Sequence, residues 1–181
     1  MEHKAGFVNI IGNPNVGKST LMNALVGQKL SIITNKAQTT RHRIIGILNE
    51  KDYQIVFSDT PGVIKPAYKL QENMMNFVHS AFKDADVLVY MVEVGEKGLK
   101  DENLYNRIKE TKLPLMLLLN KIDLAEQDEV MDAIEFWEKE LPNAMILPIS
   151  ALNGFNMNEI VAKIVDKIPD SPPYYDKDAI T

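Results

Sequence analysis

Gly12-Asn13-Pro14-Asn15-Val16-Gly17-Lys18-Ser19 decides the fold, because it matches the phosphate-binding pattern G-x-x-x-x-G-K-S at every fixed position. An apolar, β-branched run precedes it at residues 6–11, and apolar residues at helical spacing follow it at residues 20–26. The motif therefore falls at a strand-to-helix turn, the context that a phosphate-binding loop requires. Its glycines let successive backbone N–H groups turn inward around a polyphosphate, and the positive end of the new helix adds to their field.

The last two residues of this loop carry the side chains that are expected to bind phosphate and metal. Lys18 is predicted to reach the β- and γ-phosphates, and the Ser19 hydroxyl is predicted to bind Mg²⁺. The alternative is a glycine-rich turn with a chance Lys-Ser pair. Both the complete motif and its strand-to-helix context argue against that alternative. The predicted phosphate-binding residues are Gly12, Asn13, Pro14, Asn15, Val16, Gly17, Lys18, Ser19 and Thr20.

Composition narrows the class of protein. The chain has 181 residues, 45% of them hydrophobic, which suits one globular domain with a short appendage. A net charge of −5 argues against a protein that holds nucleic acid through its overall charge, and no DNA partner is expected. There is no cysteine and no signal-peptide-like start, and the longest apolar run, residues 113–119, is far short of the about 20 residues of a membrane span. We therefore expect a soluble, cytoplasmic protein.

Strand and helix patterns alternate along most of the chain. Residues 43–48 and 53–58 are strand-like runs with a short polar connection, which predicts an antiparallel hairpin at one side of the sheet. The alternation predicts an α/β fold with a mostly parallel six-stranded sheet, one antiparallel edge strand and helices on both faces. We expect a domain over residues 1–168 and a Pro-rich linker over residues 169–181. The other predicted strands are residues 86–92, 113–119 and 145–149, and the other predicted helices are residues 70–82, 102–109, 128–139 and 157–168.

A second motif predicts which base is recognised. Asn120-Lys121-Ile122-Asp123 directly follows the most apolar strand, at the end of the sheet where α/β proteins bind ligands. The Asp123 carboxylate can accept from guanine N1–H and N2–H₂ together, which adenine cannot offer. Lys121 can lie over the base while Asn120 braces neighbouring loops, and a solvated charged loop is the alternative. In Ser150-Ala151-Leu152, after the last strand, the Ala151 N–H can face guanine O6.

Two further segments are predicted to meet the γ-phosphate. Asp59-Thr60-Pro61-Gly62 ends a strand, where Asp59 could hold Mg²⁺ through a water and the Gly62 N–H could reach the γ-phosphate; an ordinary turn is the alternative. Residues 28–42 form a long stretch without periodicity, which a compact domain seldom keeps without a use. Thr40, or else Thr39, is its candidate Mg²⁺ ligand. The basic residues in and next to this stretch could equally be solvated or contact phosphate or RNA: Lys36, Arg41, His42 and Arg43.

These motifs, in this order, resemble a translation-factor-type GTPase with a Ras-like, P-loop G domain, and more closely the Era family. The phosphate-binding motif and Asp59-Thr60-Pro61-Gly62-Val63 are shared with related bacterial GTPases, so the narrower resemblance rests on Gln38-Thr39-Thr40-Arg41-His42-Arg43 and the Pro-rich tail. It implies binding of GTP and GDP with Mg²⁺, slow GTP hydrolysis, a role in 16S rRNA processing and 30S subunit assembly, and peripheral association with the inner membrane. It also implies that the chain stops before a KH domain that would bind RNA. A nucleotide-gated binding module with negligible turnover, or a related tRNA-modification or ribosome-assembly GTPase, is the alternative.

The resemblance leaves the attacking water without an obvious partner. Ras-type enzymes place it with a Gln after D-x-x-G, whereas Val63 stands here and has no polar side-chain atom. Asn15 occupies the loop position that helps to hold a potassium ion in related GTPases, so K⁺ is a further candidate cofactor; a loop-capping role for Asn15 is the alternative. The candidate catalytic residues are Lys18, Thr40, Gly62 and Asn15, and the candidate metal ligands are Ser19, Thr40 and Asp59.

Overall fold

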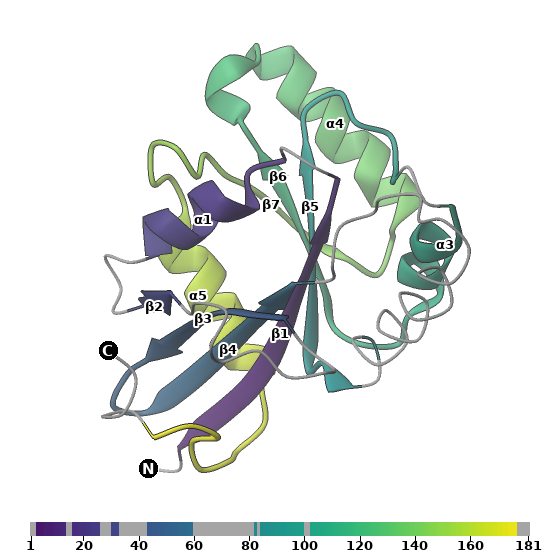
Figure 1. The fold of residues 1–181 in the computed structure, drawn as a ribbon. Coiled ribbons are helices and arrows are strands. Elements are labelled where there is room, and N and C mark those ends of the chain that lie inside the picture. Colours follow the sequence, from purple (N-terminus) through teal and green to yellow (C-terminus); the bar gives the residue numbers. More distant parts are fainter. Residues whose placement is uncertain are drawn as a thin grey trace, which may run out of the picture.

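A computed structural model describes residues 3–13, 16–25, 30–32, 43–59, 82, 84–99 and 102–176 of the chain. Within them, strands pair in the order β2-β3-β4-β1-β5-β6-β7 (Figure 1). All neighbouring pairs are parallel except β2–β3 and β3–β4. The predicted α/β class and hairpin are therefore confirmed. The strands are β1 (Lys4–Gly12), β2 (Leu30–Ile32), β3 (Arg43–Asn49), β4 (Tyr53–Asp59), β5 (Val87–Glu93), β6 (Leu115–Asn120) and β7 (Met145–Pro148).

The sheet differs from the prediction at one edge. The described residues form a sheet of seven strands rather than six, because the three-residue β2 pairs with β3. As a result the antiparallel strand β3 lies between β2 and β4 and is not the edge strand. A strand of three residues is too short to show alternation, so its place depends on a partner that the local sequence does not reveal.

Helices cover both faces of the sheet, as predicted (Figure 1). Residues of α1 (Lys18–Leu25) and α5 (Met157–Lys167) share one apolar core with alternate residues of β1, such as Val8 and Ile10. Residues of α3 (Glu102–Glu110) and α4 (Gln127–Glu140) share a second core with Ile11, on the opposite face. Every residue of β6 is buried, as a central parallel strand requires. Of the predicted helix over residues 70–82, Phe82 is described and buried; the rest lies outside the described residues.

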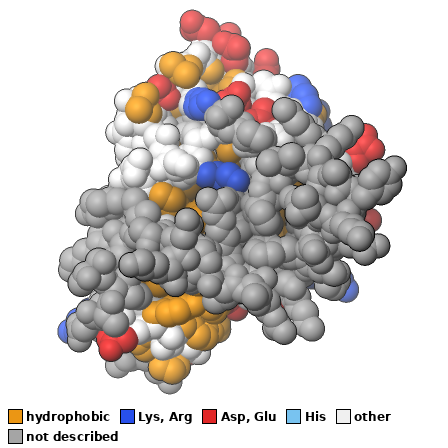
Figure 2. All heavy atoms as spheres, viewed as in Figure 1, with side chains coloured by type: hydrophobic (Ala, Val, Ile, Leu, Met, Phe, Trp, Pro, Cys, Tyr) orange, Lys and Arg blue, Asp and Glu red, His pale blue; other side chains and the backbone are white. Residues whose placement is uncertain are grey.

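The described part of the Pro-rich segment packs along the sheet. Backbone N–H groups of Ala5 and Ser171 donate to the carbonyls of Pro169 and His3, at 3.2 and 2.8 Å, so residues 169–171 run beside the start of β1. The ring centroids of Phe7 and Tyr174 lie 4.9 Å apart. Figure 2 shows hydrophobic side chains gathered at the bottom of the view, where β1 begins and this yellow segment runs in Figure 1. The linker role predicted for residues 169–181 stays a prediction.

A single buried side chain holds this segment to β4. Gln54, at 0% exposure, donates from Nε2 to the Tyr175 carbonyl and to Asn49 Oδ1, at 2.9 and 2.8 Å. Its Oε1 accepts from the backbone N–H groups of Tyr174 and Tyr175, at 2.9 and 3.1 Å. The amide is thus satisfied on both sides, which is the condition for burying it inside a sheet.

Replacing Gln54 with Ala should lower the free energy of unfolding by about 3 kcal/mol, because it removes these hydrogen bonds and leaves a cavity. Gln127→Ala is the matched control, since Gln127 is exposed in the first turn of α4. Urea unfolding followed by the fluorescence of Trp137, the single tryptophan of the chain, measures both. Equal stability of the two variants would contradict the role given to Gln54.

Candidate functional site

The G-x-x-x-x-G-K-S segment joins β1 to α1, as its pattern predicts. Gly12 ends β1, Lys18 begins α1, and the Leu21 N–H donates to the Gly17 carbonyl at 2.9 Å, which closes the first helical turn. Lys18 is half-buried and Ser19 is exposed. Pro14 and Asn15 lie outside the described residues. The backbone N–H groups at the start of α1 therefore lie where an anion can reach them.

Both glycines of the motif are required by packing. A Cβ on Gly12 would lie 2.8 Å from Val16 Cγ1 and 2.9 Å from the Met91 carbonyl oxygen. Gly17 has a φ of +112°, and a Cβ there would overlap the side-chain amide of Asn120. Glycine is the residue that tolerates both the backbone angle and the close approach.

The sheet register brings the predicted site residues to one edge. Asp59 is the last residue of β4 and pairs with Ile10 of β1, two residues before Gly12. Glu93 and Asn120 end β5 and β6 and pair with each other. This is the carboxyl edge of the parallel strands, where α/β folds bind their ligands.

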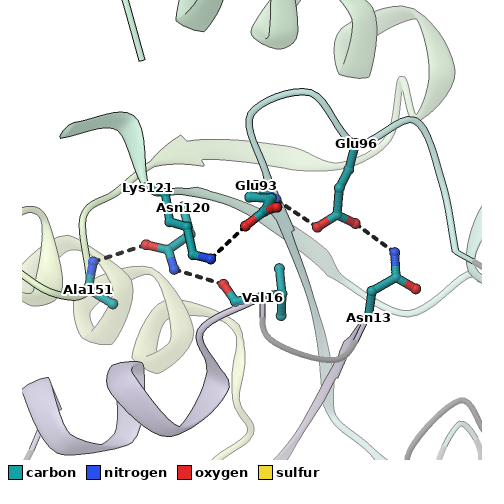
Figure 3. A network of polar contacts seen from close by, with 7 residues as sticks. All are labelled: Asn13, Val16, Glu93, Glu96, Asn120, Lys121 and Ala151. Carbon is teal, nitrogen blue, oxygen red and sulfur yellow. Dashed lines mark hydrogen bonds and ion pairs between the residues drawn. The ribbon is translucent and has the colours of Figure 1, made fainter. Parts of the chain in front are cut away.

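Asn120 joins the two predicted binding loops (Figure 3). Its side chain, 3% exposed, donates from Nδ2 to the Val16 carbonyl at 2.9 Å. Its Oδ1 accepts from the Ala151 N–H at 3.0 Å. The N–H predicted to face guanine O6 is thus bonded to Asn120 in this structure. One amide therefore connects the phosphate-binding segment, the N-K-x-D loop and the loop after β7.

The other residues of the second motif lie beside Asn120 and are more exposed. Lys121 has a φ of +66° and precedes the one-turn 3₁₀ helix η3 (Ile122–Leu124). Its ammonium lies 2.7 Å from Glu93 Oε2. Asp123 is exposed, and its Oδ1 accepts from the Ser150 hydroxyl at 2.9 Å. Ser150 therefore orients the carboxylate predicted to read guanine, while Leu152, 75% exposed, contributes no buried contact.

Part of the predicted metal and γ-phosphate machinery lies outside the described residues. This holds for Thr60, Pro61, Gly62 and Val63, and for the predicted switch residues Gln38, Thr39, Thr40, Arg41 and His42. The described residues include no group of three or more His or acidic side chains that could hold a metal. Ser19 is exposed, and its hydroxyl is the kind of oxygen ligand that suits Mg²⁺, which usually binds to one or two protein oxygens and keeps several waters; the Asp59 side chain lies outside the described part of the chain.

Two residues of the site escaped the motif analysis, Glu93 and Glu96. Glu96 accepts from Asn13 and from the Glu93 backbone (Figure 3). Burial raises the pKa of the Glu96 carboxyl above its usual value, and the hydrogen bonds from Asn13 and Glu93 partly oppose that rise. In the sequence, the signal for these two residues was a pair of acidic residues on either side of Gly95, at the end of a central strand. That strand ends at the same edge of the sheet as the other predicted site residues.

Comparison with known proteins identifies the family. A family model described as 50S ribosome-binding GTPase matches residues 7–121, which run from β1 to the N-K-x-D loop. The chain belongs to this GTPase family. Residues 7–121 include Asn120 and Lys121, whereas Asp123 and the loop after β7 lie beyond the matched part.

Individual relatives of this chain include Era proteins, so the predicted resemblance is confirmed. GTPase Era of Staphylococcus haemolyticus is 44% identical over 181 residues, which is 99% of this chain and 60% of the relative. The solved structure of an Aquifex aeolicus Era variant bound to GDP·AlF₄⁻ matches with a TM-score of 0.78, 38% identity, and coverage of 98% of this chain and 62% of the other. Era in complex with MgGDPNP and nucleotides 1506–1542 of 16S ribosomal RNA matches equally well, over 97% and 61%. The chain thus spans about 60% of the length of these relatives.

With more distant structures, the chain shares only the fold. Elongation factor SelB of Methanococcus maripaludis has 22% identity and a TM-score of 0.68.

Among the described residues, no helix has both the length and the apolar character needed to cross a membrane.

Gly17→Ala should lower the free energy of unfolding by about 3 kcal/mol or more, because it adds steric overlap with Asn120 to a strained backbone angle. Gly95→Ala is the matched control: Gly95 has a similar φ of +103° but open space where its Cβ would be. It should lose about 1–2 kcal/mol from the backbone term alone. Denaturant unfolding compares the two, and equal losses would show that the approach of Asn120 to Gly17 is unimportant.

Proposed function

We propose that this chain is a GTP-binding and GTP-hydrolysing molecular switch of the Era type. The observation that supports it best is the position of Asn120, whose amide bonds both to Val16 of the phosphate-binding segment and to Ala151 of the loop after β7. A site for a nucleoside triphosphate has to hold phosphates and base at one fixed spacing. A buried amide that bonds to the loops at both ends is suited to that task.

Each predicted contact has a chemical role in this proposal. Lys18 and the N–H groups at the start of α1 bind the phosphates, and Ser19 and Asp59 would hold Mg²⁺, which neutralises charge on the β- and γ-oxygens when bound. Asp123, oriented by Ser150, accepts from guanine N1–H and N2–H₂. For the Ala151 N–H to reach guanine O6, it has to be shared with Asn120 or released by it.

Hydrolysis is proposed to be slow, since Val63 cannot orient the attacking water. Turnover separates this proposal from the second candidate, a nucleotide-gated binding module. Single-turnover conversion of bound GTP to GDP supports the enzyme, whereas GTP recovered intact supports the binding module.

The partners proposed for the whole protein come from its Era relatives. One such relative was solved with MgGDPNP and 16S ribosomal RNA, which supports a proposed role in 16S rRNA processing and 30S subunit assembly. A cytoplasmic location stays a prediction from the composition, and peripheral association with the inner membrane stays a prediction from the Era resemblance.

Asp123→Asn should weaken GTP binding by about 2–4 kcal/mol, because an amide cannot accept from two guanine donors as a carboxylate does. The same change should improve binding of xanthosine triphosphate, whose C2 carbonyl can accept from the new amide. Competition against a fluorescent GDP analogue measures both nucleotides, and Asp128→Asn, on the exposed start of α4, is the control. Loss of GTP binding with no gain for the xanthine nucleotide would mean that Asp123 is structural.

GTP turnover should be about tenfold faster in KCl than in NaCl at equal ionic strength, because a K⁺ ion held at Asn15 would offset charge developing between the β- and γ-phosphates. Asn15→Ala should remove the preference and leave the rate in NaCl unchanged. A chain without K⁺ preference, or a variant that keeps it, contradicts a potassium site at Asn15.

A further inference from the structure

A tight turn follows β5 and folds one acidic side chain back over another residue's backbone. The Glu96 N–H donates to the Glu93 carbonyl at 3.1 Å, and Gly95, the third residue of this turn, has a φ of +103°. A positive φ at that position is the signature of a type II turn and favours glycine. Closure of the turn lets Glu96 Oε1 accept from the Glu93 N–H at 3.2 Å. The Glu96 carboxylate is therefore held in place by its own turn.

The second oxygen of this carboxylate reaches the phosphate-binding segment (Figure 3). Asn13 Nδ2 donates to Glu96 Oε2 at 2.7 Å and to the Gly98 carbonyl at 3.1 Å. Asn13 directly follows β1, so these bonds fix the start of the segment, whereas Asn120 fixes its end through Val16. The turn after β5 is a second, separate attachment of the same segment.

The same turn also reaches the base side of the site. Glu93 Oε2 lies 2.7 Å from the Lys121 ammonium, and Glu93 pairs with Asn120 in the sheet. Lys121 has a left-handed backbone conformation, with a φ of +66°. The pair is partly exposed, so it favours one position of the lysine ammonium over others by a modest free energy.

Charge and position act in opposite directions at Glu96. A carboxylate beside a segment predicted to bind phosphates repels them, and its hydrogen-bond partner there, Asn13, carries no charge. Glu93 differs, because its charge is paired with Lys121. If Glu96 matters only through its charge, removing it should improve binding of phosphates; if it matters by holding Asn13, removing it should weaken binding.

We propose that Glu93 and Glu96 are positioning residues for the nucleotide. Glu96 holds Asn13 at the start of the phosphate-binding segment, and Glu93 holds the Lys121 ammonium on the base side, so that one turn sets the spacing between the two halves of the site. This inference rests on the proposed function. A ligand that engages both halves at once loses affinity when either half becomes free to move, and such losses fall mainly on the rate of release.

The test is the release rate of a fluorescent GDP analogue from the Mg²⁺-loaded chain, measured by stopped flow after a chase with GDP. Glu96→Ala and Asn13→Ala should each speed release about tenfold, the effect expected for one lost charged hydrogen bond. The double variant should release no faster than Asn13→Ala, because that single change already removes the contact shared with Glu96. Glu135→Ala, which breaks an exposed ion pair with Lys139 on α4, is the control and should leave release unchanged.

Glu96→Gln separates position from charge and guards against misfolding of the alanine variants. The amide keeps the shape of the side chain but cannot accept through both terminal atoms, so faster release supports the positioning role. Slower release would show that the carboxylate acts only by repelling phosphates, and would overturn the proposal. Thermal unfolding of each variant confirms that the release rates come from folded protein.

Inorganic pyrophosphate, which has no base, distinguishes the role proposed for Glu96 from the role proposed for Glu93. Its own affinity, obtained from displacement after correction for the analogue's affinity in each variant, should weaken about tenfold in Asn13→Ala and Glu96→Ala but stay unchanged in Glu93→Ala, although all three release GDP faster. Unchanged GDP release in Glu93→Ala and Glu96→Ala, with normal binding by the unmodified chain, overturns the inference alone. Failure of the unmodified chain to bind GDP contradicts the proposed function and the inference with it.

Discussion

The arrangement of this site depends on one buried amide. Asn120 ends a strand that is buried along its whole length, and its side chain bonds to the Val16 carbonyl on one side and the Ala151 N–H on the other. Val16 lies 104 positions before Asn120 and Ala151 lies 31 positions after it, and neither can approach Asn120 unless the sheet is in register. The amide also excludes any side chain at Gly17. The glycine of the phosphate-binding motif therefore serves the packing of the site as well as the path of its backbone.

The sheet turns this local contact into a site by bringing strand ends together. Because β1, β4, β5 and β6 run parallel, Gly12, Asp59, Glu93 and Asn120 lie at one edge, although they are spread over most of the sequence. Strands that are apolar on both faces are stable in the middle of a sheet only when helices cover both sides. Here α1 and α5 cover one side, and α3 and α4 cover the other. The positions of these strand ends are set by the sheet, and their side chains range from the buried Asn120 to the half-buried Glu93.

A second buried amide connects separate segments at the opposite end of the sheet. Gln54 is a buried polar residue near the start of β4, and it is tolerated because the backbone of Tyr174 and Tyr175 and the side chain of Asn49 satisfy its amide. The segment that follows α5 is thereby attached to β4, the strand that ends at Asp59. The two ends of β4 thus contact different parts of the molecule, the candidate site and the described C-terminal segment.

The sequence by itself determined the elements whose signals are local: the turn between β1 and α1, the parallel alternation of strands and helices, the hairpin of β3 and β4, and the N-K-x-D loop. Glycine patterns and apolar periodicity act within a few residues, so they can be read without knowing what lies nearby in space. Only the tertiary structure decided the pairing of β2, the satisfaction of Gln54, and the bond between Asn13 and Glu96, which are 83 positions apart. The physical reason is that such hydrogen bonds depend on strand register and on the direction of single side chains. Those are set by the packing of the whole sheet and have no periodic signature in the sequence.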